Sequence, residues 1–441
     1  MTPHPWQTRI RETDPVAHAG RVRQLRSTHL QADGPAVPLG TLCRIERADA
    51  DASGPDLVAE VVAVDRTGVT LIPLDDGSRA RIGARVVALP TTDRVPVGDG
   101  FLGRATDPLG RPIDGGGPIA ANAYAPLHGE PPPPLARATL SRQLATGIRA
   151  IDGLLPLVEG QRVGIFAAAG VGKTSLLAQL CLHGDADIVI LALVGERGRE
   201  VEAFWSSLPA EKRRRTVLVA ATSDRSPMVR VRAGHYAMAL AEHWRGRGRR
   251  VLLLLDSVTR LAMAMREIGL AAGEPPTVRA YTPNVFAAIP RLIERAGALA
   301  SGGSISAIMT VLCETDAADD PLCEIMKSLL DGHILLSREL AEQGHFPAID
   351  IARSVSRQAS LVRSGEGRAA MQTVCSWISA FEQSRTMRQA GLYVPGNDPL
   401  IDQAVARHPA IERFLRQEGA TAVSALETDR LLADLVRGEA A

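Results

Sequence analysis

Nine consecutive residues near the middle of the chain combine small residues, a lysine and two hydroxyl side chains in an order typical of phosphate binding. They are Ala167, Ala168, Ala169, Gly170, Val171, Gly172, Lys173, Thr174 and Ser175. An apolar run that predicts a strand precedes them, and a segment with helical spacing follows, which is the context that a phosphate loop requires. Gly170 and Gly172 allow successive backbone N–H groups to point at a phosphate, helped by the helix N-terminus. We therefore assign residues 168–175 to nucleotide binding.

Within this loop, Lys173 and Thr174 have distinct expected roles. The Lys173 ammonium would lie between the β- and γ-phosphates of ATP, and the Thr174 hydroxyl would be a ligand of Mg²⁺. Ala167 stands where the pattern usually has its first glycine. Because that position is where the strand leaves the sheet, we expect the replacement to cost little.

A carboxylate, Asp256, directly follows the apolar run Val251–Leu255. An aspartate at the end of a buried strand beside a phosphate loop is well placed to hold the hydration shell of Mg²⁺. The other interpretation is a helix N-cap, since a helical segment follows. The phosphate loop upstream favours the metal role.

Another charged pair, Glu196 and Arg197, follows the apolar run Ile188–Val194 and has a glycine on each side. Glu196 would orient and deprotonate the attacking water, and Arg197 would stabilise charge on the γ-phosphoryl group. On local sequence alone, a solvated loop of alternating charge explains these residues equally well.

The elements that must position these residues are strands alternating with amphipathic helices. Apolar strands buried on both faces and connected by helices indicate a mostly parallel α/β sheet. The predicted strands are residues 162–167, 188–194, 216–221, 251–255, 304–312 and 333–336, and the predicted helices include residues 175–182, 229–244 and 258–268.

The regions on either side of this α/β part have other patterns. Short strands punctuated by turns predict a small β-barrel, with strands at residues 39–45, 57–64, 69–73 and 84–89. Residues 93–135 are rich in Gly and Pro and predict a connector, and only helical patterns follow residue 366. The expected domains are a barrel with a short leader (1–92), a linker with the P-loop ATPase domain (93–365), and a C-terminal helical domain (366–441).

Composition excludes several classes of protein. A formal net charge of +1 and an aromatic content of 3% disfavour a nucleic-acid-binding surface. The five cysteines show no CxxC spacing, so we expect reduced thiols and neither a zinc site nor a disulfide framework. No apolar run reaches the ~20 residues of a membrane span, and the N-terminus has no apolar signal core, so any membrane association would come through a partner.

Taken together, the phosphate loop and the runs at residues 195–201 and 256–260 resemble the catalytic core of the rotary ATPase superfamily. Within it, residues 267–277 and 286–297 are similar to segments of the type III export ATPases. The similarity extends over about nine-tenths of the chain, through residues 95–100, 110–114, 330–334, 344–350, 354–357, 402–405 and 414–417.

The resemblance implies roles for individual residues. Glu196 would be the catalytic carboxylate, Lys173 and Arg197 phosphate ligands, and Thr174 and Asp256 the metal site. Phe346 would lie against the adenine, Arg260 would support the site, and Arg357 would reach into a neighbouring subunit's site. The chain departs from the family at Ala280 (commonly Gly), Asn284 (commonly Ser) and Gln358-Ala359 (usually an apolar pair).

The resemblance also implies how the protein works. We expect a homo-oligomeric ring, a hexamer in this family, that hydrolyses Mg-ATP at the cytoplasmic face of the inner membrane. Its partners would be stalk and stator proteins of the export apparatus, secreted protein substrates and their chaperones, with no nucleic acid. The triple alanine at 167–169 favours the injectisome branch, because flagellar relatives tend to have Gly-Ser there.

Three alternatives use related chemistry. A rotary ATP synthase catalytic subunit would have an acidic loop in its C-terminal domain, but residues 390–400 contain only Asp398. A ring-shaped nucleic-acid translocase conflicts with the near-neutral charge and the aromatic-poor barrel. A regulatory subunit without catalysis conflicts with the presence of Lys173, Glu196, Asp256 and Arg357.

Overall fold

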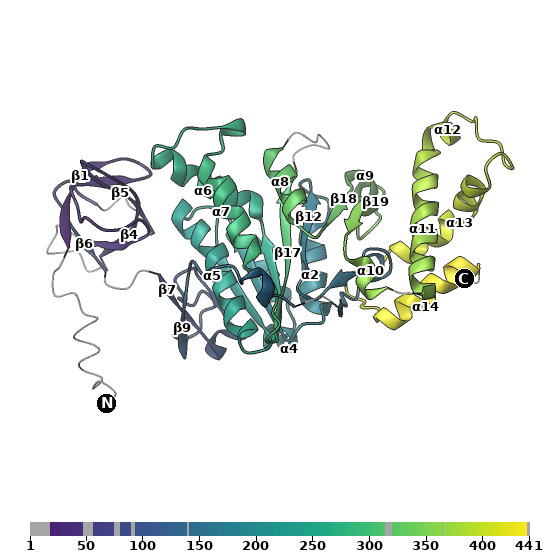
Figure 1. The fold of residues 1–441 in the computed structure, drawn as a ribbon, viewed down its shortest axis with the longest axis horizontal. Coiled ribbons are helices and arrows are strands. Elements are labelled where there is room, and N and C mark those ends of the chain that lie inside the picture. The colour runs from purple at the N-terminus through teal and green to yellow at the C-terminus, as the bar shows by residue number, and fades with distance from the viewer. Residues whose placement is uncertain are drawn as a thin grey trace.

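The computed structural model describes residues 18–46, 56–74, 80–89, 93–138, 141–313, 320–363 and 365–438. Its ribbon has three parts in a row: a barrel of strands, an α/β part, and a group of helices at the C-terminal end (Figure 1). This arrangement confirms the predicted fold class. Residues 1–17, which contain the predicted leader, and residues 75–79, between two predicted barrel strands, lie outside the described residues. The three domain boundaries remain predictions.

Six strands close into the barrel: β1 (Ala19–Leu25), β2 (Leu30–Ala32), β3 (Leu42–Ile45), β4 (Leu57–Asp65), β5 (Gly68–Pro73) and β6 (Arg85–Ala88). They follow the order β1-β2-β5-β4-β3-β6 around the barrel. Their inward-facing residues form a small hydrophobic core that belongs to the barrel alone. The sequence predicted ranges for β3 to β6 and gave none for β1 and β2. In β1 only Val22 is buried, so the strand lacks the apolar alternation that marks a half-buried strand.

The segment after the barrel contains more structure than the predicted connector. Strands β7 (Arg94–Val97) and β9 (Ala123–Pro126) pair with each other, and β8 (Ala105–Thr106) joins the edge of the main sheet beside β14. These strands are short and lie among Gly and Pro residues. Their sequence therefore shows almost none of the apolar alternation that predicts a strand.

The central sheet has the order β19-β18-β12-β17-β15-β13-β14-β8, with β16 beside β17. All of its long strands are parallel except β19, which runs antiparallel to β18. Four predicted strands have the observed bounds, whereas β19 was missed because two adjacent exposed residues, Ala352 and Arg353, break its alternation of buried and less buried residues. The strands are β12 (Arg162–Ala167), β13 (Ile188–Val194), β14 (Thr216–Ala221), β15 (Arg250–Asp256), β16 (Gly297–Ala298), β17 (Ser304–Leu312), β18 (Gly332–Leu336) and β19 (Ile349–Ser356), and a separate pair is β10 (Gln143–Leu144) with β11 (Leu157–Val158).

Helices cover both faces of this sheet. Helices α5, α6, α7 and α8 pack on one face, and α2 and α3 pack on the other, where they meet the C-terminal helices. Their bounds are α2 (Lys173–His183), α3 (Gly198–Ser207), α4 (Ala210–Arg213), α5 (Pro227–Arg245), α6 (Val258–Ala271), α7 (Pro283–Glu294), α8 (Pro321–Leu329), α9 (Arg338–Glu342) and α10 (Ala359–Val362). The helices predicted within α2, α5 and α6 are confirmed.

The C-terminal part is helical, as predicted. It consists of α11 (Gly365–Gln383), α12 (Arg385–Gln389), α13 (Pro399–Leu415) and α14 (Ala425–Arg437). Val374, Trp377, Ile411, Phe414 and Leu432 join the same core as α2. Every helix in the described part of the chain is too short or too polar to cross a bilayer.

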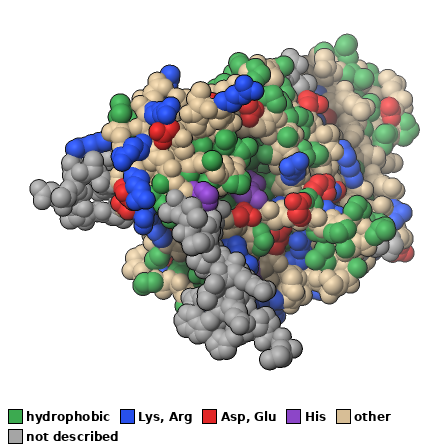
Figure 2. Space-filling model, turned by 60° about the vertical axis from the view of Figure 1, so that its left-hand side comes forward, with side chains coloured by type: hydrophobic (Ala, Val, Ile, Leu, Met, Phe, Trp, Pro, Cys, Tyr) green, Lys and Arg blue, Asp and Glu red, His purple; other side chains and the backbone are tan. Residues whose placement is uncertain are grey.

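Figure 2 shows the face of the molecule on the barrel side. Basic side chains are common at the barrel end, with acidic side chains among them, and both signs are interspersed over the rest of this face.

Candidate active site

Three parallel strands carry the candidate residues to one edge of the sheet. The phosphate loop follows β12, Asp256 ends β15 and Glu196 lies two residues after β13. Asp256 stands opposite Leu193 in the ladder between β15 and β13, so both carboxylates leave the sheet at nearly the same level. Strand β17 separates β12 from β15, a long-range order that the sequence pattern does not reveal.

The phosphate loop has the backbone that phosphate binding needs. Gly170 and Gly172 have φ values of 81° and 88°, a region that L side chains rarely adopt. Val171 between them is buried and anchors the loop, while Gly170 faces open space. Helix α2 begins at Lys173, so its free N–H groups and the positive end of its dipole face the space above the loop.

Lys173 lies between the two carboxylates. Its Nζ donates a hydrogen bond to Asp256 Oδ1 and lies 3.5 Å from Glu196 Oε1. Thr310 on β17 donates a second hydrogen bond to Asp256 Oδ1, at 2.7 Å. Since Asp256 is 2% exposed and Glu196 5% exposed, the lysine charge compensates two negative charges that the sheet edge would otherwise bury alone.

Glu196 has the environment of a general base. Burial raises its pKa, the neighbouring Asp256 charge raises it further, and Lys173 and Arg260 offset part of that rise. Arg260 Nε lies 3.2 Å from Glu196 Oε1, and its guanidinium also donates to the Gly195 carbonyl at 2.5 Å. Even so, Glu196 Oε1 is buried without a hydrogen bond from any described residue. A carboxylate oxygen in that position is available to accept a proton from water.

The residues present fit a magnesium ion. Thr174 contributes a hydroxyl at the start of α2, and Asp256 contributes a carboxylate, both of them the hard oxygen ligands that Mg²⁺ takes. The Glu196 carboxylate lies 3.5 Å from Lys173, and its Oε1 has ion-pair partners but no hydrogen bond from a described residue, so it is suited to accept one from a water of the hydration shell. The bound ion would neutralise charge on the phosphates.

A cavity of about 570 Å³ lies beside the phosphate loop. Phe346, which is 44% exposed, forms part of its wall, and its ring stands over Gly172 so closely that a Cβ there would lie 3.2 Å from Cε1. Ser175, Leu176 and Gln179 of α2 form the opposite wall. An aromatic ring at this distance from a phosphate loop is suited to stacking on a purine.

The remaining wall of this cavity comes from the C-terminal part, residues 416–419. The Gln417 backbone N–H donates to the Phe346 carbonyl at 2.9 Å, and its side chain donates to the carbonyls of Gly147 and Thr421. Sequence reasoning missed these residues, because a Gln after a predicted helix gives no signal of ligand binding. The family similarity at residues 414–417 assigned them no role in binding.

Two predicted site arginines lie outside this cluster. Arg197 is the N-cap residue of α3, is 65% exposed and pairs with Glu200 at 3.9 Å. Arg357 follows β19 and donates to the Lys327 carbonyl at 3.1 Å. Since Ser356 pairs with Gly332, and Gly332 with Val163 near the start of β12, Arg357 lies at the sheet edge opposite the phosphate loop of its own chain.

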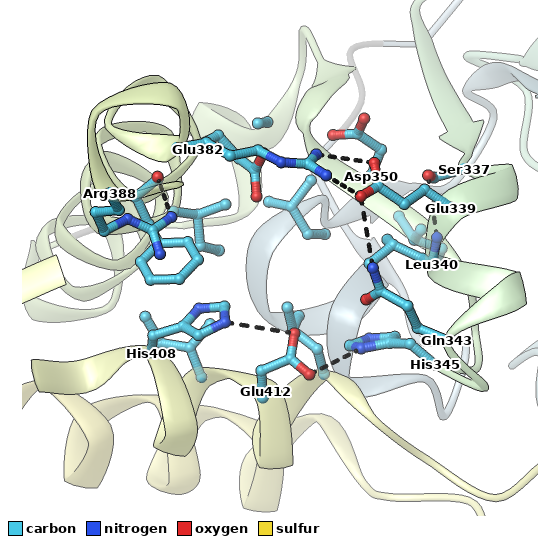
Figure 3. Close-up of a pocket in the computed structure, with 18 of the residues that line it drawn as sticks. Ser337, Glu339, Leu340, Gln343, His345, Asp350, Glu382, Arg388, His408 and Glu412 are labelled. Atoms are coloured by element: carbon cyan, nitrogen blue, oxygen red, sulfur yellow. Dashed lines mark hydrogen bonds and ion pairs between the residues drawn. The ribbon is translucent and has the colours of Figure 1, made fainter. Parts of the chain in front are cut away.

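A second cavity, of about 280 Å³, lies between the α/β part and the C-terminal helices (Figure 3). Glu412 of α13 points into it, 3.3 Å from His345 Nδ1 and 4.0 Å from His408 Nε2, and Arg385 pairs with Glu339 across it. His345 directly precedes Phe346. The pairs around this cavity therefore hold the C-terminal helices next to the wall of the candidate site that contains Phe346.

The fold and the site together define a P-loop nucleoside triphosphatase that has a barrel before its catalytic part and helices after it. Residues 147–356 match the model of the ATP synthase alpha/beta family, nucleotide-binding domain, and residues 364–434 match that of the T3SS EscN ATPase C-terminal domain.

Individual relatives agree with these matches. The type 3 secretion system ATPase of Pseudomonas syringae pv. syringae is 44% identical over 94% of this chain and 93% of its own length. The flagellum-specific ATP synthase of Treponema pallidum is 42% identical over 93% and 92%. The assembled ATPase EscN of enteropathogenic E. coli superposes with a TM-score of 0.89 at 39% identity, over 95% of this chain and 100% of that one.

The chain belongs to the family of type III secretion and flagellar export ATPases, and it is an ATPase. The family predicted by the sequence motifs is confirmed.

Proposed function

We propose that the protein hydrolyses Mg-ATP at the subunit boundaries of a homohexameric ring and uses that work to export proteins through a type III secretion apparatus. The observation that carries the catalytic part is Lys173 between the Asp256 and Glu196 carboxylates, at the mouth of a phosphate loop. In the free protein the lysine charge satisfies the carboxylates. A triphosphate would take over Lys173 and leave Asp256 to Mg²⁺ and Glu196 to water.

Each residue then has a chemical task. Backbone N–H groups of residues 168–175 and the Lys173 ammonium hold the β- and γ-phosphates, with Thr174 and Asp256 as ligands of the magnesium ion. Glu196 accepts a proton from the attacking water, and Arg260 keeps Glu196 in place. Phe346 stacks on the adenine. Arg197, which has its side chain in solvent, would turn inward to reach the γ-phosphate.

In the ring, each active site would receive Arg357 from the neighbouring subunit. Arg357 lies at the sheet edge far from its own phosphate loop, so it can complete only the site of a neighbour. Two solved structures support assembly: EscN in its assembled form, and EscN in complex with its central stalk EscO, which superposes with a TM-score of 0.86. By similarity we assign this chain a homo-oligomeric state and a stalk partner.

Within the family, we assign the chain to the secretion branch. Identities of 44% to a secretion ATPase and 42% to a flagellar one do not separate the branches, so the assignment is based on Ala167, Ala168 and Ala169. The ring would work at the cytoplasmic face of the inner membrane, held there by stator proteins. It would release chaperones and unfold their secreted cargo.

The decisive test of the catalytic part is Glu196→Gln. We expect turnover to fall ~10²–10⁴-fold because the general base is lost, while binding of a fluorescent ATP analogue with Mg²⁺ is retained. The matched control is Glu202→Gln on α3, the helix that begins just after Glu196, where the side chain is exposed, and it should hydrolyse like the wild type. Undiminished turnover in Glu196→Gln would remove Glu196 from the mechanism.

A further inference from the structure

Two of the five cysteines, ten residues apart in the sequence, meet in the structure. Cys313 directly follows β17 and Cys323 lies in the first turn of α8, with their Sγ atoms 2.9 Å apart. That is within about 1 Å of the ~2.05 Å bond of a disulfide, so little movement is needed to join them. The spacing of the cysteines in the sequence did not predict this contact.

Cys313 differs in reactivity from the other four thiols. The hydrogen bond from Cys323 lowers the pKa of Cys313, whereas the same bond and burial raise the pKa of Cys323. Burial raises the pKa of each remaining thiol, Cys43, Cys181 and Cys375, to about 11. Since the thiolate is the reactive form and Cys313 is only half-buried, an oxidant attacks Cys313 first.

The pair lies next to the catalytic machinery. The Cys313 backbone N–H donates to the carbonyl of Ala167 at 3.0 Å, the last residue before the phosphate loop. On the other side, α8 links two further segments. Asp320 at its N-cap pairs with Arg279 at 3.1 Å, and the Lys327 carbonyl accepts from Arg357 at 3.1 Å.

We propose that Cys313 and Cys323 form a peroxide-sensitive dithiol that closes into a disulfide and slows ATP turnover by fixing α8 to the end of β17. The Cys313 thiolate attacks a peroxide oxygen, which breaks the O–O bond, gives a sulfenic acid and releases hydroxide that is protonated to water. The Cys323 sulfur then attacks the sulfenic sulfur, the S–S bond forms and a second water leaves. In sum, two thiols and one hydrogen peroxide give one disulfide and two waters.

A disulfide that fixes α8 would account for the expected loss of ATP turnover. Helix α8 carries the backbone carbonyl that holds Arg357, and Cys313 is hydrogen-bonded to the strand end that carries the phosphate loop. A covalent bond between them prevents α8 from moving relative to the phosphate loop while neighbouring sites form and open. Reduction by a dithiol restores both sulfhydryls and the motion.

The test treats the reduced full-length protein with hydrogen peroxide. We expect an intact mass lower by two hydrogens, a several-fold loss of ATP turnover that dithiothreitol reverses, and a pair of Glu-C peptides joined through Cys313 and Cys323, since Glu314 lies between the two cysteines. Cys375→Ser is the matched control, because it removes another half-buried thiol and should respond like the wild type. In Cys323→Ser we expect no joined peptide, and oxidation of Cys313 to sulfinic acid.

Three outcomes contradict the proposal. If thiols are lost without the joined peptide, the two cysteines do not form a redox pair. If the disulfide forms and turnover is unchanged, its regulatory role is wrong. If Cys323→Ser loses turnover reversibly like the wild type, another thiol is responsible. Hydrolysis by the reduced protein, measured first, tests the proposed function separately.

Discussion

At the scale of single residues, the catalytic cluster was predictable where each residue follows a strand. Lys173, Asp256 and Glu196 each come after an apolar parallel strand, and such strands end at the same edge of a sheet. Phe346 has no such signal and was expected only from the family resemblance. Arg197 shows the limit of this reasoning, because glycine neighbours do not determine where an exposed side chain points.

One buried carboxyl outside the site has a measurable effect on stability. Burial raises the pKa of Glu60 to about 7, with Asp93 raising it further and Arg232 lowering it. The folded protein therefore holds this proton more tightly than the unfolded chain between about pH 4.5 and pH 7. The contribution of Glu60 to the free energy of unfolding is fully present below that range and falls as the pH rises through it.

Glu60→Gln, which cannot ionise, should match the wild type in melting temperature at pH 5. At pH 8 it should melt higher, because the wild type then carries a buried charge that costs at most about 3 kcal/mol. Thermal denaturation followed by circular dichroism at both pH values measures the difference. The same offset at pH 5 and pH 8 would show that Glu60 does not titrate in this range.

At the scale of elements, the turn at Val278–Ala280 is a place where the sequence departs from the family and the backbone shows why that matters. Arg279 and Ala280 both have positive φ, 52° and 59°. A residue with a Cβ is disfavoured in this region by roughly 1–2 kcal/mol, whereas glycine is not. The glycine common in relatives at this position therefore fits the conformation, and Ala280 stores strain.

Ala280→Gly should relieve this strain and raise the free energy of unfolding by about 1 kcal/mol, after the greater entropy of the unfolded glycine is counted. The matched control is Ala272→Gly at the end of α6, where φ is −76° and glycine should destabilise. Urea unfolding followed by tryptophan fluorescence compares the two. A loss of stability in both variants would contradict the strain.

The predictability of the elements follows from their burial. Strands β12, β13, β14 and β17 were predicted to the residue, because burial on both faces leaves an uninterrupted apolar run. Strands β1 and β19 were missed because exposed polar and charged residues interrupt them. Pairings between distant segments, such as Cys313 with Cys323, depend on tertiary packing and leave no pattern in the sequence.

At the scale of the whole molecule, the separation of Arg357 from its own phosphate loop predicts that turnover depends on assembly. We expect Arg357→Ala to retain ATP binding and to lose ~10³–10⁵-fold in hydrolysis, as for arginines supplied in trans. Wild-type turnover per subunit should rise with protein concentration until assembly is complete.

A mixture of two inactive variants provides the control for the role of Arg357 across a subunit boundary. Lys173→Ala chains keep Arg357 and Arg357→Ala chains keep the phosphate loop, so mixed rings contain composite sites and should regain part of the turnover that each variant lacks alone. If the mixture stays as inactive as its components, Arg357 does not act across a boundary.

The backbone hydrogen bond between Gln417 and Phe346 joins the C-terminal part to the wall of the cavity in which we expect the purine, here called the purine cavity. Because residues 416–419 directly follow α13, any tilt of that helix displaces one wall of the purine cavity. Thermodynamic linkage then requires the reverse: a bound purine resists the tilt by as much as the tilt weakens the purine. A load that pulls on the helical tip would therefore act as a competitor of the nucleotide without ever entering its pocket.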